Sequence, residues 1–142
     1  MSQNKLTAAD YPLAEKRPEL VTGARGRRLD EITLDAVLSD HVTLEDLRIT
    51  RDALLQQGEI SAASGRPTLG ENFARAADLI AVPQDTIMRV YELLRPGRAK
   101  SKDELIAAAR ELRETYKAER MAAFVEEAAD VYEARGLFKR RF

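Results

Sequence analysis

The chain has 142 residues, of which 44% are hydrophobic and 33% charged, and its 23 basic and 24 acidic residues give a formal net charge of −1. This length is enough for one domain with a core of its own, and the apolar fraction excludes a chain that is disordered throughout. The near-neutral charge argues against a dedicated nucleic-acid-binding protein, which needs a basic surplus to displace counterions from phosphates.

The N-terminal residues 1–30 show no helical period of apolar side chains. The first ten residues, MSQNKLTAAD, lack the apolar stretch of a secretory signal. Pro12 and Pro18 fix their own φ angles and favour extended geometry in the residues that precede them. We therefore predict an extended, proline-containing arm over residues 1–30.

The arm ends in the sequence TGARGRR at 22–28. Gly23 and Gly26 can take positive φ angles, so this sequence is typical of a flexible basic turn. Helical signals then continue to the C-terminus, and we predict a single helical domain over residues 31–142. The longest uncharged apolar run, LIAVP at 79–83, is too short to cross a bilayer, so we expect a cytoplasmic protein without membrane contact.

Short helices are predicted first within this domain. Three threonines stand before apolar segments and can cap helices there: Thr33, Thr43 and Thr50. Asp46 can complete a capping box with Thr43. The helix after Thr50 would end at Gly65, a typical C′ residue. Gly58 lies inside that helix, where glycine costs about 1 kcal/mol relative to alanine.

Longer apolar stripes at helical spacing follow. The first comprises Leu69, Phe73, Ala76, Ala77 and Ile80 and ends before Pro83; the second comprises Ile87, Val90, Tyr91 and Leu94 and stops at Pro96 and Gly97. Pro83 suits the first turn of the second helix.

The C-terminal region opens with a predicted capping box of Ser101 and Glu104. Its apolar stripe comprises Leu105, Ala108, Leu112, Tyr116, Phe124, Ala128, Val131 and Tyr132. The pattern is compatible with one long helix or with two helices broken near Lys117. Strand-like alternation is not convincing anywhere, so we predict an all-α fold of several short helices and a longer C-terminal helical region.

No residue pattern in the chain indicates catalysis. The chain has no cysteine, and its single histidine, His41, lacks the further partners that a metal site or a catalytic triad requires. GRPTLGEN at 65–72 has the spacing of a phosphate loop, but Glu71 and Asn72 replace the Lys and Ser/Thr. Asp40 and His41 are adjacent and do not form the Asp-x-His-x-x-Gly motif of base-off cobalamin binding. We therefore expect no catalytic residue, no bound cofactor and no metal, with His41 at the surface near a helix cap.

Clustered charges are expected to be solvated. The acidic cluster comprises Glu126, Glu127 and Asp130, and the basic clusters comprise Arg25, Arg27 and Arg28, and Lys139, Arg140 and Arg141. The acids alternate with the apolar stripe, as on the outer face of a helix. The basic clusters lack the interleaved aromatic residues of a base-stacking surface, which argues against nucleic-acid binding.

The arm sequence DYPLAEKRPELV, at 10–21, carries apolar residues that join no helical stripe: Tyr11, Pro12, Leu13, Pro18 and Leu20. These side chains must be buried either on the chain's own helices or on a partner. Aromatic anchors such as Tyr11 are enriched at interfaces. The residues alone leave both alternatives open.

Five segments resemble, in order, the small (gamma) subunit of adenosylcobalamin-dependent diol and glycerol dehydratases. They are DYPLAEKRPE (10–19), EDLRIT (45–50), NFARAADLIAVP (72–83), VYELLRP (90–96) and AAFVEEAADVYEAR (122–135). The resemblance covers nearly the whole chain. Gly97 departs from it, because the family pattern has an aromatic residue there, and the loop GRAKSKDEL at 97–105 is about one residue longer than in the family.

The resemblance implies a subunit of a lyase that converts 1,2-propanediol, glycerol or ethanediol to the aldehyde by a radical route. In this family the large subunit carries the chemistry, cobalamin lies between the large and medium subunits, and the assembly has two copies of each chain. The small subunit supplies no catalytic residue and wraps partly around the large one, which implies that the arm lies along a partner. The candidate interface residues are Tyr11, Pro12, Leu13, Pro18, Arg75, Tyr91, Arg95 and Pro96.

The short sequence before Asp10 resembles the glycerol-type enzyme, or one whose other subunits carry any targeting, because diol-type small subunits often carry a longer N-terminal extension associated with packaging in a bacterial microcompartment. We therefore expect a cytoplasmic location, with a microcompartment as the alternative. A helical adaptor that stands alone and buries the arm on itself is the alternative function.

Overall fold

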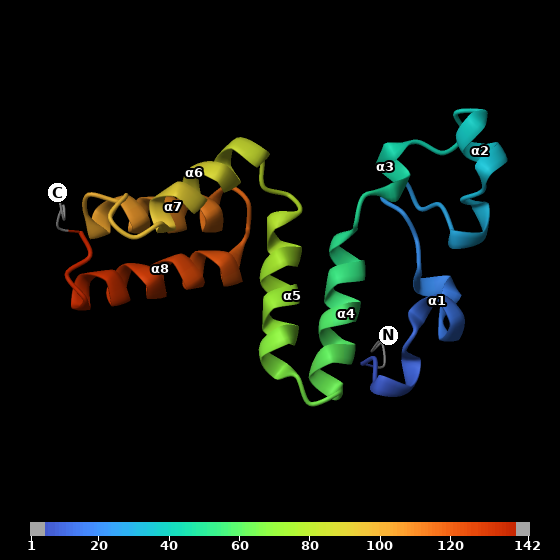
Figure 1. The fold of residues 1–142 in the computed structure, drawn as a ribbon, viewed down its shortest axis with the longest axis horizontal. Coiled ribbons are helices and arrows are strands. Elements are labelled where there is room, and N and C mark those ends of the chain that lie inside the picture. Colours follow the sequence, from blue (N-terminus) through green and yellow to red (C-terminus); the bar gives the residue numbers. More distant parts are fainter. Residues whose placement is uncertain (1–4, 139–142) are drawn as a thin grey trace. The chain divides into compact units, whose positions relative to one another are not determined.

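Helices form the described part of the chain, residues 5–138 of this computed structural model, and no strand lies within that range (Figure 1). The helices are α1 (Leu13–Lys16), α2 (Leu34–Leu38), α3 (Leu44–Leu47), α4 (Arg51–Ala63), α5 (Pro67–Leu79), α6 (Gln84–Leu94), α7 (Lys102–Glu114) and α8 (Glu119–Ala134). Short 3₁₀ turns occupy Ala8–Asp10, Pro18–Leu20 and Leu29–Glu31. The predicted all-α fold is confirmed.

The chain divides into two compact units, Met1–Ala77 and Asp78–Phe142. The first unit contains the arm, α1 to α4 and most of α5, and the second contains α6 to α8. The division into an arm over 1–30 and a helical domain over 31–142 stays a prediction.

The arm of the first unit is folded into short turns instead of running continuously extended. Pro12 occupies the N-cap position of α1, and Pro18 begins the 3₁₀ turn that follows it. Leu6 and Leu13 are buried with Ile60 of α4, and the Leu6 N–H donates to Glu59 Oε2 at 2.9 Å. One side of the arm is therefore covered by the chain's own fourth helix.

Helices α4 and α5 approach closely at two glycines. A Cβ atom added to Gly58 would lie 3.1 Å from the Gly70 carbonyl oxygen, and one added to Gly70 would lie 2.9 Å from the Gly58 carbonyl oxygen. The intrinsic cost of glycine inside a helix is therefore offset by a backbone contact that a side chain would prevent. The helix ends as predicted, because Gly65 has φ +77° and the Arg66 N–H donates to the Ser61 carbonyl in a Schellman motif.

The core of the second unit lies between α7 and α8. Its largest fully buried side chains are Leu105, Leu112 and Val125, and the residues packed around them include Ala109, Ala118, Ala122 and Ala129. Lys117 has φ 56°, and the Ala118 N–H donates to the Leu112 carbonyl at 3.0 Å, which closes the turn between the two helices. The C-terminal region is therefore two helices broken at Lys117.

The predicted apolar stripe was wrong in α8. The buried side chains there are Ala122, Val125 and Ala129, whereas Phe124 and Val131 remain 38% and 39% exposed. The prediction followed the larger apolar residues of this segment, whereas the face packed on α7 consists of Ala122, Val125 and Ala129. Three further residues assigned to stripes are also exposed: Leu69, Ile80 and Tyr91.

The predicted caps are confirmed except for one. Thr33 Oγ1 accepts the Ala36 N–H at 3.2 Å, and Thr50 Oγ1 accepts the Ala53 N–H at 3.1 Å. The box of Ser101 and Glu104 was wrong, because Glu104 Oε2 accepts the N–H of Lys100 at 2.8 Å instead. Ser101 still occupies the N-cap position of α7.

Candidate interaction surface

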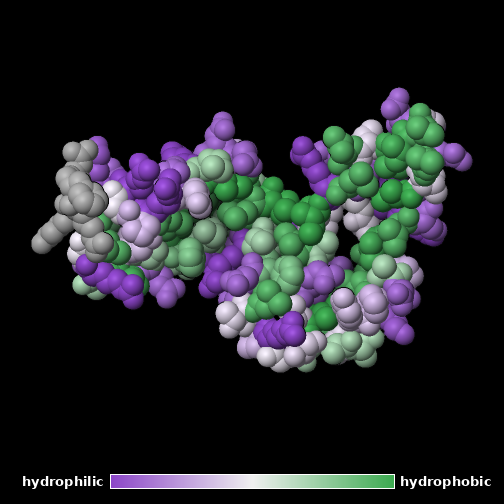
Figure 2. Space-filling view, in the orientation of Figure 1, coloured by the Kyte–Doolittle hydropathy of each residue, from purple (hydrophilic) through white to green (hydrophobic). Residues whose placement is uncertain are grey.

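Exposed large apolar side chains are concentrated in residues 29–49, which we call the docking segment. They are Leu29, Leu34, Val37, Leu38, Leu44, Leu47 and Ile49. Leu38 and Leu44 are 74% and 81% exposed, more than any other large apolar side chain of the described residues. Hydrophobic residues gather over α2 and α3 in Figure 2. Scattered exposed leucines are ordinary, but a contiguous group of this size indicates a binding surface.

The docking segment has almost no core of its own. Helices α2 and α3 span five and four residues, too short to be stable in isolation. Val42 and Asp46 are the only residues of the segment that are buried. Polar contacts must therefore hold much of its shape.

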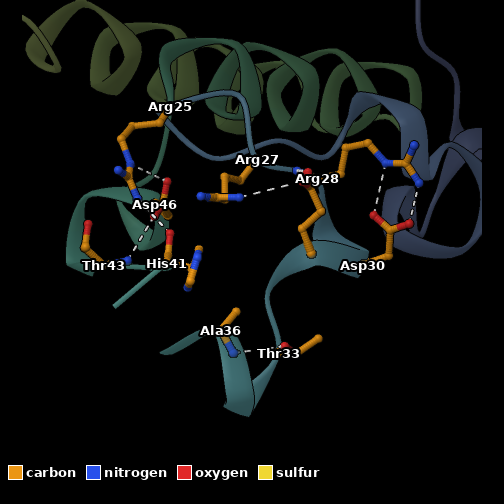
Figure 3. Close-up of polar contacts among 10 residues, drawn as sticks. Arg25, Arg27, Arg28, Asp30, Thr33, Ala36, His41, Thr43 and Asp46 are labelled. Atoms are coloured by element: carbon orange, nitrogen blue, oxygen red, sulfur yellow. Dashed lines mark hydrogen bonds and ion pairs between the residues drawn. The ribbon is translucent and has the colours of Figure 1, made fainter. Parts of the chain in front are cut away.

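Arg25 and Asp46 supply the most extensive of these contacts (Figure 3). Arg25 Nε donates to Asp46 Oδ1 at 2.8 Å, and its Nη2 donates to Asp46 Oδ2 and, at 3.2 Å, to the His41 carbonyl. Asp46 Oδ2 also accepts the Thr43 N–H at 2.9 Å, as the predicted capping box requires. We call this group of contacts the Arg25–Asp46 clamp; it joins the 22–28 turn to His41, in the middle of the α2–α3 connection, and to the first turn of α3.

The clamp holds Asp46 in its charged form. The Arg25 guanidinium, followed by the Thr43 N–H, lowers the pKa of the Asp46 carboxyl from 3.8 to about 2. The carboxylate is fully buried, whereas the Arg25 side chain is 46% exposed. At neutral pH the pair is therefore a charge-assisted, bidentate contact with one face open to solvent.

The 22–28 turn is closed by backbone hydrogen bonds, and its predicted flexibility stays a prediction. Gly23 donates its N–H to the Arg27 carbonyl at 2.8 Å, and Gly26 takes φ +79°. Gly23 is needed for a different reason: an added Cβ would collide with the Asp46 carbonyl oxygen. The turn therefore places its backbone directly against α3.

The basic cluster of this turn is neutralised within the chain. Besides the clamp, Arg27 lies 3.7 Å from Glu31, and Arg28 Nε donates to Asp30 at 3.0 Å. These three arginines are consequently paired with acids instead of only solvated. The second basic cluster, Lys139, Arg140 and Arg141, lies outside the described residues.

The arm residues predicted as interface contacts border the docking segment. Tyr11 is 62% exposed, Pro12 is half-buried and Pro18 is exposed, whereas Leu13 is buried inside the first unit. Pro18 and Leu29 line the same hollow of about 560 Å³. Pro18 of the arm therefore borders the docking segment at Leu29.

Two smaller hollows lie along the arm and the docking segment. One of about 260 Å³ is lined by Tyr11 and Pro12, and one of about 190 Å³ by Leu29, Leu47 and Ile49. Concave sites bordered by exposed apolar side chains can accept the side chains of a partner.

The remaining predicted interface residues lie elsewhere. Arg75 belongs to α5 in the first unit, where its Nη1 donates to Asn72 Oδ1 at 2.9 Å. Tyr91, Arg95 and Pro96 are exposed in the second unit, and Arg95 pairs with Glu92 at 3.1 Å. Arg75 is half-buried, and the role of all four residues as contacts stays a prediction.

The charged groups outside this surface serve structural contacts. Arg113 of α7 forms a two-pronged pair with Glu126 of α8, which lowers the pKa of the Glu126 carboxyl, and Lys102 lies 2.8 Å from Asp130. Two of the acids expected to be solvated, Glu126 and Asp130, therefore join the two helices, whereas Glu127 is exposed as expected.

Neither metal binding nor membrane insertion is indicated within residues 5–138. No cluster of three or more potential metal ligands occurs there, and no helix in that range has the length and apolar character needed to span a bilayer. His41 is exposed beside the cap of α2, and its Nδ1 lies 2.8 Å from Ser39 Oγ. The exposed apolar side chains of the docking segment are suited to binding another protein.

Comparison with known proteins identifies the kind of partner. A family model described as "Dehydratase small subunit" matches residues 6–139. The chain belongs to the dehydratase small subunit family. A propanediol dehydratase small subunit from Citrobacter freundii is 48% identical over 138 residues, which is 97% of this chain and 80% of that protein. One from Salmonella typhimurium strain LT2 is 48% identical over 131 residues, or 92% of this chain and 75% of that protein.

Membership confirms the predicted family, and a dehydratase small subunit has other dehydratase subunits as its partners. Sequence reasoning found the arm but missed the docking segment of this small subunit. The available signal was that Leu34, Val37 and Leu38 form a complete apolar stripe on a helix too short to build a core.

Proposed function

We propose that the chain is the non-catalytic small subunit of a coenzyme B12-dependent diol or glycerol dehydratase. The enzyme converts a 1,2-diol or glycerol to an aldehyde and water, and this subunit stabilises its assembly with the large catalytic and medium subunits. Both relatives are named propanediol dehydratase small subunits, which supports 1,2-propanediol as the substrate of the assembled enzyme. The observation that carries the structural role is the exposed apolar docking segment.

The partner of the docking segment in this proposal is the large subunit. Seven large apolar side chains of the segment remain exposed in the isolated chain, although the second unit buries its core almost completely. An obligate subunit has such a surface because the partner completes its core. Tyr11, Pro12 and Pro18 extend the same contact, while Leu13 is already buried by Ile60.

Arg75, Tyr91, Arg95 and Pro96 form a secondary set of proposed contacts. Exposed tyrosine and arginine side chains are frequent anchors at interfaces. We place two copies of each of the three chains in the assembly. Its proposed location is the cytoplasm, with a microcompartment as the alternative.

Adenosylcobalamin belongs to the large and medium subunits in this proposal. The residues described here do not fit a cobalamin site: His41 is the single histidine of the chain, and its ring nitrogen contacts Ser39 in an exposed turn. No step of the reaction is therefore assigned to this chain.

Co-expression tests the proposal. The chain should co-purify with the large and medium subunits in a complex that produces aldehyde only with adenosylcobalamin and a diol, and native mass spectrometry should give two copies of each chain. Full activity and a stable assembly of the two larger subunits without this chain would contradict the structural role. A stable monomer that fails to co-purify would favour the adaptor.

A further inference from the structure

The docking segment is held in shape by contacts that are not themselves part of its apolar surface. Its buried residues are Val42 and Asp46, and the Asp46 carboxylate is completely enclosed. A segment of this kind would be free to change shape if its polar contacts were lost. It would then have to become ordered when the partner binds, which weakens binding.

The Arg25–Asp46 clamp opposes such disorder at three points. Arg25 contacts both carboxylate oxygens and the His41 carbonyl, and Asp46 fixes the first turn of α3 through the Thr43 N–H. These atoms lie at the junction between α2 and α3, the two helices that carry Leu38 and Leu44. Without the clamp, α2 and α3 could move relative to each other, and the positions of Leu38 and Leu44 would no longer be fixed.

We propose that Arg25 and Asp46 are positioning residues that hold the docking segment in its binding-competent shape before the partner subunit arrives. This inference rests on the proposed function, because it presumes a dehydratase subunit as the partner. Asp46 acts through α3 and not by contact, since its carboxylate is buried within the chain. Only the fraction of molecules with an ordered segment binds, so the clamp raises the apparent affinity by raising that fraction.

The close contact of Gly23 supports the same assignment. The backbone of the 22–28 turn lies so near α3 that a Cβ at this position would collide with the Asp46 carbonyl oxygen. The backbone of the turn at Gly23 and the side chain of Arg25 therefore both contact α3 at Asp46. The 22–28 turn therefore supports α3, and the guanidinium of Arg25 is occupied by its hydrogen bonds to Asp46.

Arg25→Gln is the test variant, because it removes the guanidinium and keeps a polar side chain of moderate size. Arg89→Gln is the matched control: Arg89 is 48% exposed, close to the 46% of Arg25, and its Nη2 donates to Glu111 within the second unit. Arg25→Lys is the conservative variant, which retains the charge and loses the two-pronged geometry.

Hydrogen exchange of the isolated full-length chain provides the first measurement. We expect amides of residues 41–48 to exchange roughly tenfold faster in Arg25→Gln, because a hydrogen-bonded charged contact is lost. Residues 102–134 should exchange as before in both Arg25 variants, which shows that each of these chains is folded. Arg89→Gln should leave the exchange rate of residues 41–48 unchanged. In Arg25→Lys that rate should lie between the rates of Arg25→Gln and of the unsubstituted chain.

Association with the complex of large and medium subunits provides the second measurement. We expect roughly tenfold weaker binding of Arg25→Gln through a slower association rate, with the dissociation rate unchanged, because the bound segment is ordered in both chains. Faster dissociation without faster exchange would show that Arg25 contacts the partner directly and overturn the inference. Faster exchange with unchanged binding would also overturn it. If the unsubstituted chain does not bind, the proposed function fails together with the inference.

Discussion

The Asp46 carboxylate accepts hydrogen bonds from Arg25 and from the Thr43 N–H, and both stabilise its ionised form. Its pKa in the folded chain is about 2, below the ordinary 3.8. A carboxyl whose pKa is lowered on folding contributes stability at pH values above its unfolded pKa, and that contribution is lost as the pH falls through the folded pKa. The structure around α3 should therefore lose stability as the pH falls towards the pKa of Asp46.

We predict that exchange at residues 41–48, corrected for its intrinsic pH dependence, is constant from pH 7 to about 5 and rises between about pH 4 and 2. Asp46→Asn should exchange faster at neutral pH and lose the additional acid-dependent rise, because its amide does not titrate. Other carboxyls titrate in the same range, so the difference between the two chains is the quantity to measure. An equal rise in both chains would show that Asp46 is not the responsible group.

Tyr11 and Leu13 are two residues apart but have different surroundings. Tyr11→Ala should weaken assembly with the larger subunits and leave the helical content of the isolated chain almost unchanged, because the ring is 62% exposed. Leu13→Ala should instead destabilise the first unit by about 2–3 kcal/mol, because it removes a buried side chain beside Ile60. Circular dichroism measures the helical content of both variants, and co-purification with the larger subunits measures their assembly. Loss of helicity in Tyr11→Ala with assembly intact would place Tyr11 in the chain's own core.

Helices α4 and α5 depend on the absence of two side chains. Alanine normally stabilises a helix relative to glycine by about 1 kcal/mol. At Gly70 the added Cβ would lie 2.9 Å from the Gly58 carbonyl oxygen, closer than Cβ atoms come to other atoms in folded proteins. The helix pair must then separate, and the contacts around it are lost.

We predict that Gly70→Ala lowers the free energy of unfolding of the first unit by about 1–3 kcal/mol. Gly58→Ala should lower the free energy of unfolding by less, because its Cβ would lie 3.1 Å from the Gly70 carbonyl oxygen, farther than the 2.9 Å at Gly70. Urea denaturation followed by circular dichroism measures both changes. A stabilised Gly70→Ala variant would show that helix propensity outweighs the contact.

The helices of the docking segment should tolerate substitution in the isolated chain. Leu44→Ala changes a side chain that is 81% exposed, so the free energy of unfolding should change by no more than about 0.5 kcal/mol. Binding to the larger subunits should weaken by more than about 1 kcal/mol. Val131→Ala on α8, 39% exposed, is the control outside the docking segment. Equal binding of the Leu44→Ala and unsubstituted chains would remove Leu44 from the interface.

The local features of these elements could be predicted from the sequence. Thr33, Thr50 and Gly65 act within a few residues of themselves, so their capping roles follow from the order of residues alone. The buried face of α8 could not be predicted in the same way, because it depends on the tertiary contact with α7, which covers Ala122, Val125 and Ala129 and leaves Phe124 and Val131 exposed.

Tertiary packing decided the other differences. The closeness of Gly58 to Gly70 involves two helices, and sequence pattern indicated only an unfavourable glycine. Likewise, periodicity shows which face of a helix is apolar and not what covers it. The sequence therefore left open whether the leucines of α2 and α3 are covered, and the structure was needed to find them exposed.

The whole molecule combines a well-packed second unit with a first unit that leaves apolar side chains exposed. The core between α7 and α8 buries Leu105, Leu112 and Val125 almost completely, while the docking segment exposes seven large apolar residues. A protein that functioned alone would lose stability and solubility through such a surface. Membership of the dehydratase small subunit family implies other dehydratase subunits as partners, and we propose that this surface contacts them.

Hydrogen exchange of the free chain and of the chain assembled with the large and medium subunits tests this account most directly. We predict that assembly protects residues 29–49 and the neighbourhood of Tyr11 more strongly than any other part of residues 5–138. Residues 105–112 of the second unit should change little, because their core is already complete. A stable complex in which residues 29–49 exchange as fast as in the free chain would contradict the docking segment as the subunit interface.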